Sequence, residues 1–264
     1  MKKLIALFMF VSLMFCTNEE VPQRFIIIYT GANVEVSTQV ETTMATVGMI
    51  VPEGTTIRTT DSTVDLQSER GHLIRIKEFT EFTLMRMEDD ISTRVNIGNI
   101  YVRANRLDAG DEFVVVTPTA IAGVRGTTFS ISVQSERSVV STFDGAVIVH
   151  SHGESLLTSE NERVVVENRE QRLEEFNPSI REQMEVQTLI NVDSPEEYSD
   201  RMSDALDGIT IQGTPTGTIE TLVMRDGTHI RGSVIGQYGS NVVILTPDGR
   251  QLNLHKEDIK EILF

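Results

Sequence analysis

Apolar and polar residues alternate with a period of two from Phe25 to Glu167, and this alternation constrains the fold more than any other feature. Successive side chains of a strand point to opposite faces, so a period of two is typical of half-buried strands. Some segments alternate, as in HLIRIKEF and TTFSISV, and others are short β-branched runs typical of buried strands, as in RFIIIYT and EFVVVTP; polar or glycine-containing turns separate them. No helical pattern interrupts them, so we predict an all-β domain over residues 25–167, built as a sandwich, a roll or a solenoid.

Glycines recur through this domain at intervals of 23, 27, 28 and 19 residues, at Gly48, Gly71, Gly98, Gly126 and Gly145. The intervals are too uneven for a true sequence repeat. They suit irregular coils in which each turn of the chain needs one tight corner, because glycine adopts backbone angles that other residues avoid.

The composition changes after residue 167, where the chain becomes rich in Glu, Gln and Arg. We predict that residues 168–209 form a short helical connector. The stretch Ser194–Glu197 has the pattern of a capping box, with serine as N-cap, proline at the first helical position and glutamate three residues on. Tyr198, Met202 and Leu206 follow at a spacing of four and form one apolar stripe. A second helix is expected earlier in the same segment.

The last part of the chain, residues 217–264, follows a linker of small residues and has the pattern of a short β-meander. Asp226-Gly227 and Asp248-Gly249 are typical hairpin turns. An open meander of this size exposes two strand edges, so we predict closure into a small β-barrel.

Residues 1–16 have the features of a bacterial secretory signal: lysines, then an apolar run that is too short to span a membrane comfortably. The run ends at Cys16, the only cysteine of the chain, whose position resembles the lipid-modified cysteine of a bacterial lipoprotein. We therefore expect a periplasmic or outer-membrane protein that contacts the membrane through a lipid anchor at Cys16. The alternative is a cysteine within an uncleaved or differently cleaved signal, since Phe15 precedes it where a small residue is usual.

The net charge of −16 argues against two classes of partner. An acidic chain gains nothing from the phosphates of a nucleic acid, so we predict no nucleic-acid binding. The same charge disfavours a bare anionic membrane surface.

The segment TPTAIAGVRGTTFSISV places a permanently charged residue between two apolar runs. Thr117-Pro118 ends one strand, because proline cannot donate to a ladder. Arg125-Gly126-Thr127 then turns the chain, and Phe129 begins a new alternating strand. The five donors of a guanidinium suit unpaired carbonyls or a carboxylate at such a corner. We predict that Arg125 is a buried structural residue that joins two β layers; the alternative is capture of an anionic ligand.

This segment resembles the core motif of FecR-type domains: a strand, Thr-Pro, small residues, then Val-Arg-Gly-Thr, any residue and Phe. Thr117, Pro118, Arg125, Gly126, Thr127 and Phe129 are the matching residues. Two further stretches, VGMIVPEGTTIRTTDSTVDLQ and VVSTFDGAVIV, resemble the same family, so the likeness covers about residues 30–167. It implies a twisted, solenoid-like β stack.

The best-known FecR proteins are membrane-spanning regulators that relay an iron–siderophore signal to a sigma factor. The sequence shows no anti-sigma segment, transmembrane helix or secretin-like unit of that kind, so we do not carry the relay role over. The resemblance implies an exported β domain that binds an envelope protein or polymer as a scaffold. The alternative is an envelope sensor that passes a signal to a protein partner.

The last fifty residues resemble small Sm-like barrels through Asp226, Gly227, Ile230, Gly232 and Val234. RNA binding is not carried over, because the chain is acidic and its expected location lies outside the cytoplasm.

Candidates for metal ligands fall into three groups, none of which has the pattern of a known catalytic motif. The groups are His150 and His152 with Glu154, the run Glu88-Asp89-Asp90, and Asp108 with Asp111 and Glu112. We interpret all three as solvated turn or strand-end residues. We therefore predict no metal, no cofactor and no enzymatic activity, with a calcium- or zinc-dependent enzyme as the alternative from another class.

Overall fold

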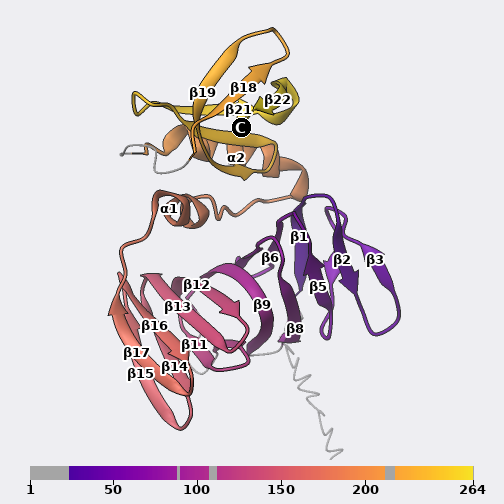
Figure 1. The fold of residues 1–264 in the computed structure, drawn as a ribbon. Helices are drawn as coiled ribbons and strands as arrows, with labels where there is room; N and C mark the ends of the chain where they lie inside the picture. Colours follow the sequence, from indigo (N-terminus) through magenta and orange to yellow (C-terminus); the bar gives the residue numbers. More distant parts are fainter. Residues whose placement is uncertain (1–23, 88–89, 107–111, 212–217, 264) are drawn as a thin grey trace, which may run out of the picture.

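The fold was derived from a computed structural model, which describes residues 24–87, 90–106, 112–211 and 218–263. Seventeen strands form one continuous sheet that is folded into two stacked layers, and a second sheet of five strands lies beyond two helices (Figure 1). The prediction of an all-β fold with a short helical connector is confirmed.

The first layer is called the covered sheet, because the helices lie on its outer face. Its strands pair antiparallel throughout. In spatial order they are β4 (Ile50–Val51), β1 (Phe25–Thr30), β6 (Val64–Ser68), β7 (Leu73–Ile76), the second half of β9 (Ile91–Ala104), β12 (Thr127–Gln134), β13 (Arg137–Asp144), β16 (Glu162–Glu167) and β17 (Glu170–Glu175).

The second layer is called the open sheet. It contains one parallel pair, β9 with β10, and is otherwise antiparallel. In spatial order its strands are β3 (Thr42–Met44), β2 (Val34–Ser37), β5 (Thr56–Thr59), β8 (Glu81–Met87), the first half of β9, β10 (Phe113–Val116), β11 (Ile121–Val124), β14 (Ala146–Ser151) and β15 (Glu154–Ser159).

Strand β9 passes from the open sheet to the covered sheet at Gly98, whose φ is +99°. A β-carbon at this position would lie 2.5 Å from the α-carbon of Thr80, so the crossing requires glycine. After β9 the chain places hairpins alternately on the two layers. The result is a coiled roll with fully buried residues such as Ile27, Phe82 and Phe129 between the layers.

The roll extends eight residues beyond the boundary predicted at residue 167. Strand β17 (Glu170–Glu175) pairs with β16 along its whole length. Its residues are largely exposed, since it is the last strand of the layer. An edge strand of this kind needs no apolar alternation, so its sequence, EQRLEE, carries no strand pattern.

The connector contains α1 (Ile180–Gln187) and α2 (Tyr198–Gly208). A capping box starts α1, with the Ser179 side chain and the Glu182 side chain each bonded to the other's backbone. The box predicted at Ser194 is wrong: Pro195–Glu197 forms a 3₁₀ turn, η1, without a side-chain cap.

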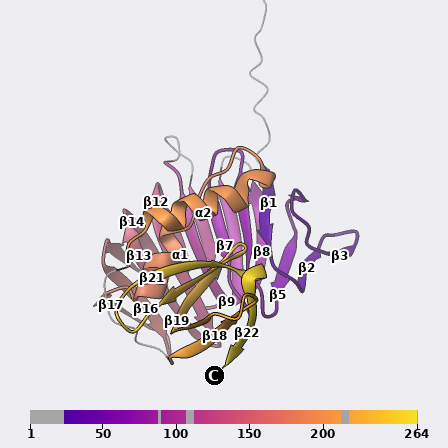
Figure 2. The same cartoon turned by 90° about the horizontal axis from the view of Figure 1, so that it is seen from above.

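The stripe predicted on α2 is confirmed, because Tyr198, Met202 and Leu206 are all buried. These side chains pack in one apolar cluster with Leu73 of the covered sheet and Val243 of the C-terminal sheet. The helices therefore join the two sheets of the molecule. Seen from above, the helices and the C-terminal strands overlie the strands of the roll (Figure 2).

The C-terminal unit is an antiparallel sheet in the order β21 (Gln251–His255), β20 (Asn241–Leu245), β19 (His229–Tyr238), β18 (Glu220–Met224) and β22 (Ile259–Leu263), with a 3₁₀ turn η2 (Lys256–Asp258) before the last strand. Gly227 and Gly249 occupy the predicted hairpin turns with φ of +88° and +81°.

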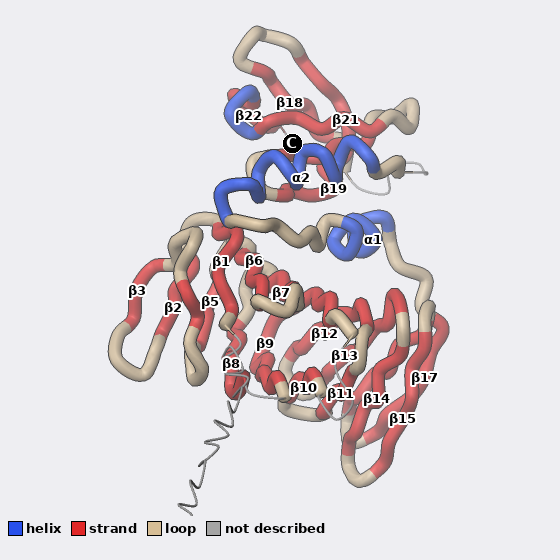
Figure 3. The backbone as a smooth tube through the Cα atoms, turned by 180° about the vertical axis from the view of Figure 1, so that it is seen from behind, coloured by secondary structure: helices blue, strands red, loops and turns tan. Residues whose placement is uncertain are grey.

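The predicted closure of this unit into a barrel is wrong for the part of the chain that the structure describes. The edge strands β21 and β22 form no ladder with each other. One face of the curved sheet buries its own cluster around Leu222 and Ile244, and the other packs on α2 through Val243 and Leu245 (Figure 3). Because both faces find partners, apolar burial does not require a closed barrel.

Candidate functional site

The Thr-Pro end of the motif is a hydrogen-bonded corner between β10 and β11. The Thr117 hydroxyl donates to the carbonyl of Ala120 at 3.0 Å and accepts from its amide at 2.9 Å. The Ser138 hydroxyl donates to the Thr117 hydroxyl oxygen at 2.9 Å and accepts a hydrogen bond from the Thr119 hydroxyl at 2.6 Å. Pro118 is exposed beside them. The buried Thr117 side chain thus holds the corner to the neighbouring strand β13.

The Arg-Gly-Thr end is a second corner, between β11 and β12. Gly126 has a φ of +73°, and a β-carbon on it would approach the α-carbon of Arg106 to 3.2 Å. The buried Thr127 hydroxyl donates to the carbonyl of Ala146 at 2.9 Å. A β-carbon on Gly145 would lie 2.9 Å from the Gly126 carbonyl, so the two turns pack closely. Glycine at the corner is therefore required by its geometry.

The two corners of the motif lie at opposite ends of the β10–β11 hairpin, separated by four ladder pairs. Phe129 lies fully buried in the core, with its ring edge-on to Phe113 at 6.4 Å between centroids. The structure therefore does not bring the six motif residues together into one site, although Thr117, Thr127 and Phe129 each have a clear structural role.

The prediction that Arg125 is buried between two β layers is wrong. Arg125 is exposed at the corner, between buried Val124 and half-buried Gly126. The alternation of β11 explains this, because Ala122 and Val124 face the core while Ile121 and Gly123 face outward. A residue one step beyond Val124 follows the outward phase.

The buried arginine of this fold is Arg75 on β7, which is about 2% exposed. Its Nε and Nη2 donate to the two oxygens of Asp65 on β6 at 2.9 and 2.7 Å. Its Nη1 donates to Glu185 of α1 at 3.2 Å and to the hydroxyl of Thr188 at 2.6 Å, and Nη2 donates to the carbonyl of Thr188 at 3.0 Å. The Tyr198 hydroxyl on α2 donates to Asp65 at 2.5 Å. One guanidinium thus joins the covered sheet to both helices.

Arg75, Asp65, Lys77, Glu185, Thr188 and Tyr198 form a hydrogen-bonded cluster that we call the buried junction, and its charges are balanced. Glu185 also accepts from Lys77 at 2.8 Å, so two cations face two carboxylates. The Arg75 guanidinium lies 5.5 Å from the ring centroid of Tyr238, which brings the C-terminal sheet into the same cluster. Burial alone would lower the pKa of Arg75, but the charges of Asp65 and its neighbours raise it well above its ordinary value.

Two tyrosines, Tyr198 and Tyr29, lie in or against the same buried cluster. Burial and the charge of Asp65 raise the pKa of Tyr198 well above its ordinary value. The Tyr198 ring stacks on Tyr29 of β1, with 5.3 Å between centroids. Because both pKa values are raised, the Arg75 guanidinium stays charged and the Tyr198 hydroxyl stays neutral near neutral pH, so both can hold their hydrogen bonds to Asp65.

Sequence reasoning missed this network, although a signal was present. Asp65 in STVDLQS and Arg75 in HLIRIKEF each interrupt an apolar run at a position that faces away from the roll core. Opposite charges directly across a predicted hairpin indicate a pair. Nothing in the local sequence indicates that helices from residues 180–208 bury this pair.

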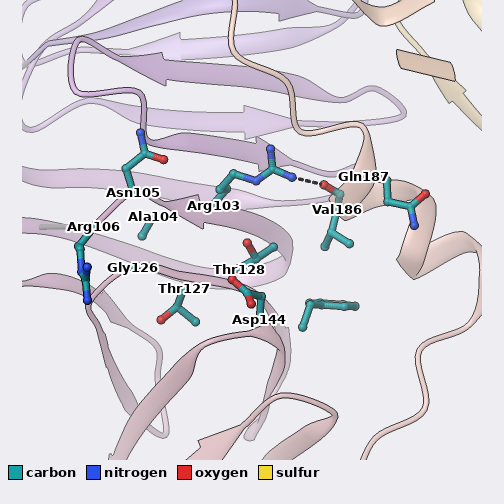
Figure 4. A pocket seen from close by; sticks show the side chains of 11 residues that line it. Arg103, Ala104, Asn105, Arg106, Gly126, Thr127, Thr128, Asp144, Val186 and Gln187 are labelled. Carbon is teal, nitrogen blue, oxygen red and sulfur yellow. Dashed lines mark hydrogen bonds between the residues drawn. The ribbon is translucent and has the colours of Figure 1, made fainter. Parts of the chain in front are cut away.

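A cavity of about 490 Å³ opens beside the Gly126 corner (Figure 4). Arg103 reaches from β9 across its upper side and donates to the carbonyls of Val186 at 2.9 Å and Leu189 at 2.5 Å. Burial lowers the pKa of Arg103. The lining residues are Arg103, Ala104, Asn105, Arg106, Gly126, Thr127, Thr128, Phe143, Asp144, Val186 and Gln187.

The polar groups of this cavity are largely occupied by the fold. Arg103 satisfies carbonyls at the end of α1, and Thr127 is bonded to the backbone of β14. Arg125 lies outside the set of lining residues. The anionic-ligand alternative for Arg125 therefore gains no support from this cavity.

The histidine pair predicted as a metal alternative does not converge. His150 shares a 2.7 Å hydrogen bond with Ser155, and exposed His152, in a turn with φ of +49°, shares one with Ser151. Within the residues that the structure describes, no group of three His, Cys, Asp or Glu side chains is placed to hold a metal ion.

The other acidic candidates are described only in part. Asp90 accepts a hydrogen bond from the amide of Glu112 at 2.9 Å, which joins the residues that directly precede the parallel strands β9 and β10. Glu88, Asp89, Asp108 and Asp111 lie outside the described residues, as does Cys16. Among the described helices, none has the length and apolar character needed to cross a membrane.

Comparison with known proteins assigns the central part of the roll. Residues 55–148 match the family model described as FecR protein. Two crystal structures of a candidate anti-sigma factor from Parabacteroides distasonis ATCC 8503, at 1.65 and 2.50 Å, resemble the chain at 20% identity with TM-scores of 0.43 and 0.42. The likeness spans 46% of this chain and about 60% of theirs (60% and 58%). No curated protein matches the chain.

The family match contains both corners described above, from Thr117 to Thr127, and β12 with its buried Phe129. The next two hairpins after these corners, β12–β13 and β14–β15, lie in the covered sheet and the open sheet respectively. Residues 55–148 of this chain are thereby similar to the FecR family in both corners and in β12.

Proposed function

We propose that the protein is a non-enzymatic, protein-binding regulatory module of the bacterial cell envelope. The observation that carries this proposal is the FecR match over residues 55–148, which favours a signalling or regulatory role. A regulator of this kind acts through a protein partner, in agreement with the scaffold and sensor interpretations of the sequence.

The geometry of the motif supports binding over catalysis. Thr117 and Thr127 are buried and hydrogen-bonded to backbone carbonyls, so their hydroxyls hold strands together. The most perturbed cation, Arg75, is enclosed by its partners in the junction. Catalysis requires groups that can reach a substrate, whereas these groups build a rigid scaffold.

The envelope location rests on residues 1–16, with Cys16 as the anchor residue. The proposed arrangement holds the roll close to a membrane through the seven residues between Cys16 and Arg24. An extended chain covers at most about 3.5 Å per residue, so the tether would reach roughly 25 Å.

The experiment uses the full-length chain with a C-terminal tag in its native bacterium, with mild crosslinking before solubilisation. We expect a stoichiometric protein partner and incorporation of labelled palmitate that is lost in Cys16→Ser. Failure to enrich any protein over an untagged strain would defeat the binding proposal. An unlabelled protein whose mature N-terminus lies elsewhere would defeat the anchor alone.

A further inference from the structure

The two layers of the roll differ in what lies on their outer faces. The helices and the C-terminal sheet lie on the covered sheet, whereas the outer face of the open sheet points away from them (Figures 1 and 3). At one end of the open sheet, on β10, β11, β14 and β15, outward positions carry apolar or small residues. We call the following six residues the apolar face: Val114, Val116, Ile121, Gly123, Ile148 and Leu157.

These residues are neighbours across the strands. In one row, Val114 pairs with Gly123, Gly123 with Ile148, and Ile148 with Leu157. In the adjacent row, Val116 pairs with Ile121. Ile121, Ile148 and Leu157 are 45, 44 and 58% exposed. A contiguous exposed apolar surface of this kind marks an interaction site more often than scattered apolar residues do.

Gly123 gives this face a notch that the fold itself does not need. Its φ is not in the left-handed region, and a β-carbon added there would meet nothing within 4 Å. Glycine inside a strand weakens it and often marks the close approach of another chain. Here it lies between Val114 and Ile148, so a partner's side chain can contact the backbone between two apolar walls.

Two exposed arginines lie beside the apolar face, in a chain whose net charge is −16. Arg94 pairs directly with Val116, and Arg86 lies on the next strand opposite Ser92; both are exposed. The outward positions of β10, β11, β14 and the first half of β9, all described, include no Asp or Glu. Exposed Glu154 at the start of β15 is in the opposite register from Leu157, and Glu81 on β8 is bonded to Arg58 and Asn96.

We propose that the apolar face docks an acidic amphipathic segment of a partner protein. One apolar side chain of the segment fills the notch at Gly123, others contact Ile148 and Leu157, and its carboxylates lie beside Arg94 and Arg86. A second copy of this chain is a poor occupant, because a symmetric contact through this face would bring Arg94 and Arg86 of both copies together. The inference rests on the proposed function and assigns its partner and its surface.

The test places a photo-crosslinking residue, p-benzoylphenylalanine, at exposed Leu157 of the full-length chain in its native bacterium. The crosslinked peptide is identified by mass spectrometry. The expected product is a peptide of another protein with apolar residues and several Asp or Glu. A peptide without acidic residues, a lipid adduct or a crosslink to a second copy would overturn the proposal.

A matched pair of variants separates the surface from general effects. Gly123→Glu fills the notch and adds a repelling charge, and we expect at least a tenfold lower crosslink yield, since like charges in contact cost several kcal/mol. Gly208→Glu makes the same change at the end of α2, where a β-carbon also meets nothing within 4 Å, and should leave the yield unchanged. Thermal melting verifies that both variants fold.

The outcomes distinguish this inference from the proposed function. An unchanged yield in a folded Gly123→Glu variant rejects the apolar face as the docking site. If the Leu157 probe captures no protein while the tagged chain still retains its partner, the surface is wrong and the function stands. If neither experiment finds a protein partner, both fail.

Discussion

Replacing Arg75 by methionine tests whether one guanidinium holds the roll, the helices and the C-terminal sheet together. Methionine keeps much of the aliphatic volume but removes every donor. Asp65 and Glu185, whose side chains are 5% and 3% exposed, would then be buried without their shared cation. A buried carboxylate that loses its partner is far more costly than an exposed one.

The magnitude follows from what each carboxylate retains. Removal of one partner from a buried ion pair typically costs about 3–5 kcal/mol. Asp65 keeps the hydrogen bond from Tyr198, and Glu185 keeps its ion pair with Lys77, so each carboxylate retains one partner. We therefore expect a loss near the lower end, about 3 kcal/mol, which is a large share of the 5–15 kcal/mol that stabilises a typical native protein.

The chain contains its own reporter for this junction. It has no tryptophan and four tyrosines, and all four lie in or against the apolar cluster of the helices. Tyrosine fluorescence during urea unfolding therefore follows the junction, while far-ultraviolet circular dichroism follows mainly the strands of the roll. In Arg75→Met the fluorescence midpoint should fall by about 1 M urea or more and separate from the dichroism midpoint.

Arg58→Met is the matched control, because Arg58 pairs with Glu81 at 2.8 Å on the open sheet but is 49% exposed. A surface pair of this kind contributes about 0–1 kcal/mol. The reasoning is refuted if Arg75→Met is no less stable than Arg58→Met, or if its two midpoints coincide at the wild-type value.

Three further changes test other parts of the fold. Burial of the His72 ring lowers its pKa from 6.5 to about 4, so the unfolded chain takes up the proton first as pH falls. The free energy of unfolding should therefore drop by about 3 kcal/mol between pH 6.5 and 4. Calorimetry of His72→Asn should show a correspondingly smaller dependence of stability on pH in this range. Thr117→Val removes a buried hydroxyl with three partners and should cost about 1–3 kcal/mol in urea unfolding, against little change for exposed Thr42→Val. Gly126→Ala should lower the free energy of unfolding by about 1–2 kcal/mol because its φ is positive, whereas Gly123→Ala should raise it by about 0.4–1 kcal/mol; equal effects would contradict the assigned geometry.

The strands of the roll could be predicted from sequence where one face is buried, because burial imposes the period of two. The prediction failed at β17, whose residues Glu170–Glu175 lie mostly in solvent on both faces. It failed again for closure of the C-terminal sheet, since the packing of Val243 and Leu245 on α2 is a long-range contact that no local pattern encodes.

The candidate site shows the same limit. The motif located two real corners, and Gly126 and Thr127 have the roles that a tight turn demands. The sequence also suggested an arginine between layers, but it is Arg75 and not Arg125 that occupies such a position. Each arginine directly follows an apolar strand residue, so the local sequence does not distinguish them. Arg75 is buried because α1 and α2 pack over β7, where its guanidinium bonds to Glu185 and Tyr198.

The contrast between the two layers indicates how each one binds its neighbours. On the covered sheet, docking of the helices must desolvate Asp65 and Arg75, which is favourable only when Thr188, Glu185 and Tyr198 lie in their observed positions. Such an interface has one geometry and is built once, during folding. The open sheet presents apolar side chains and an empty notch, whose burial gains free energy without requiring a fixed set of polar partners. The partner proposed for this face could dissociate without leaving a buried charge unpaired, because Arg94 and Arg86 are exposed to water. The proposed regulatory contact needs this property, and the helical junction lacks it.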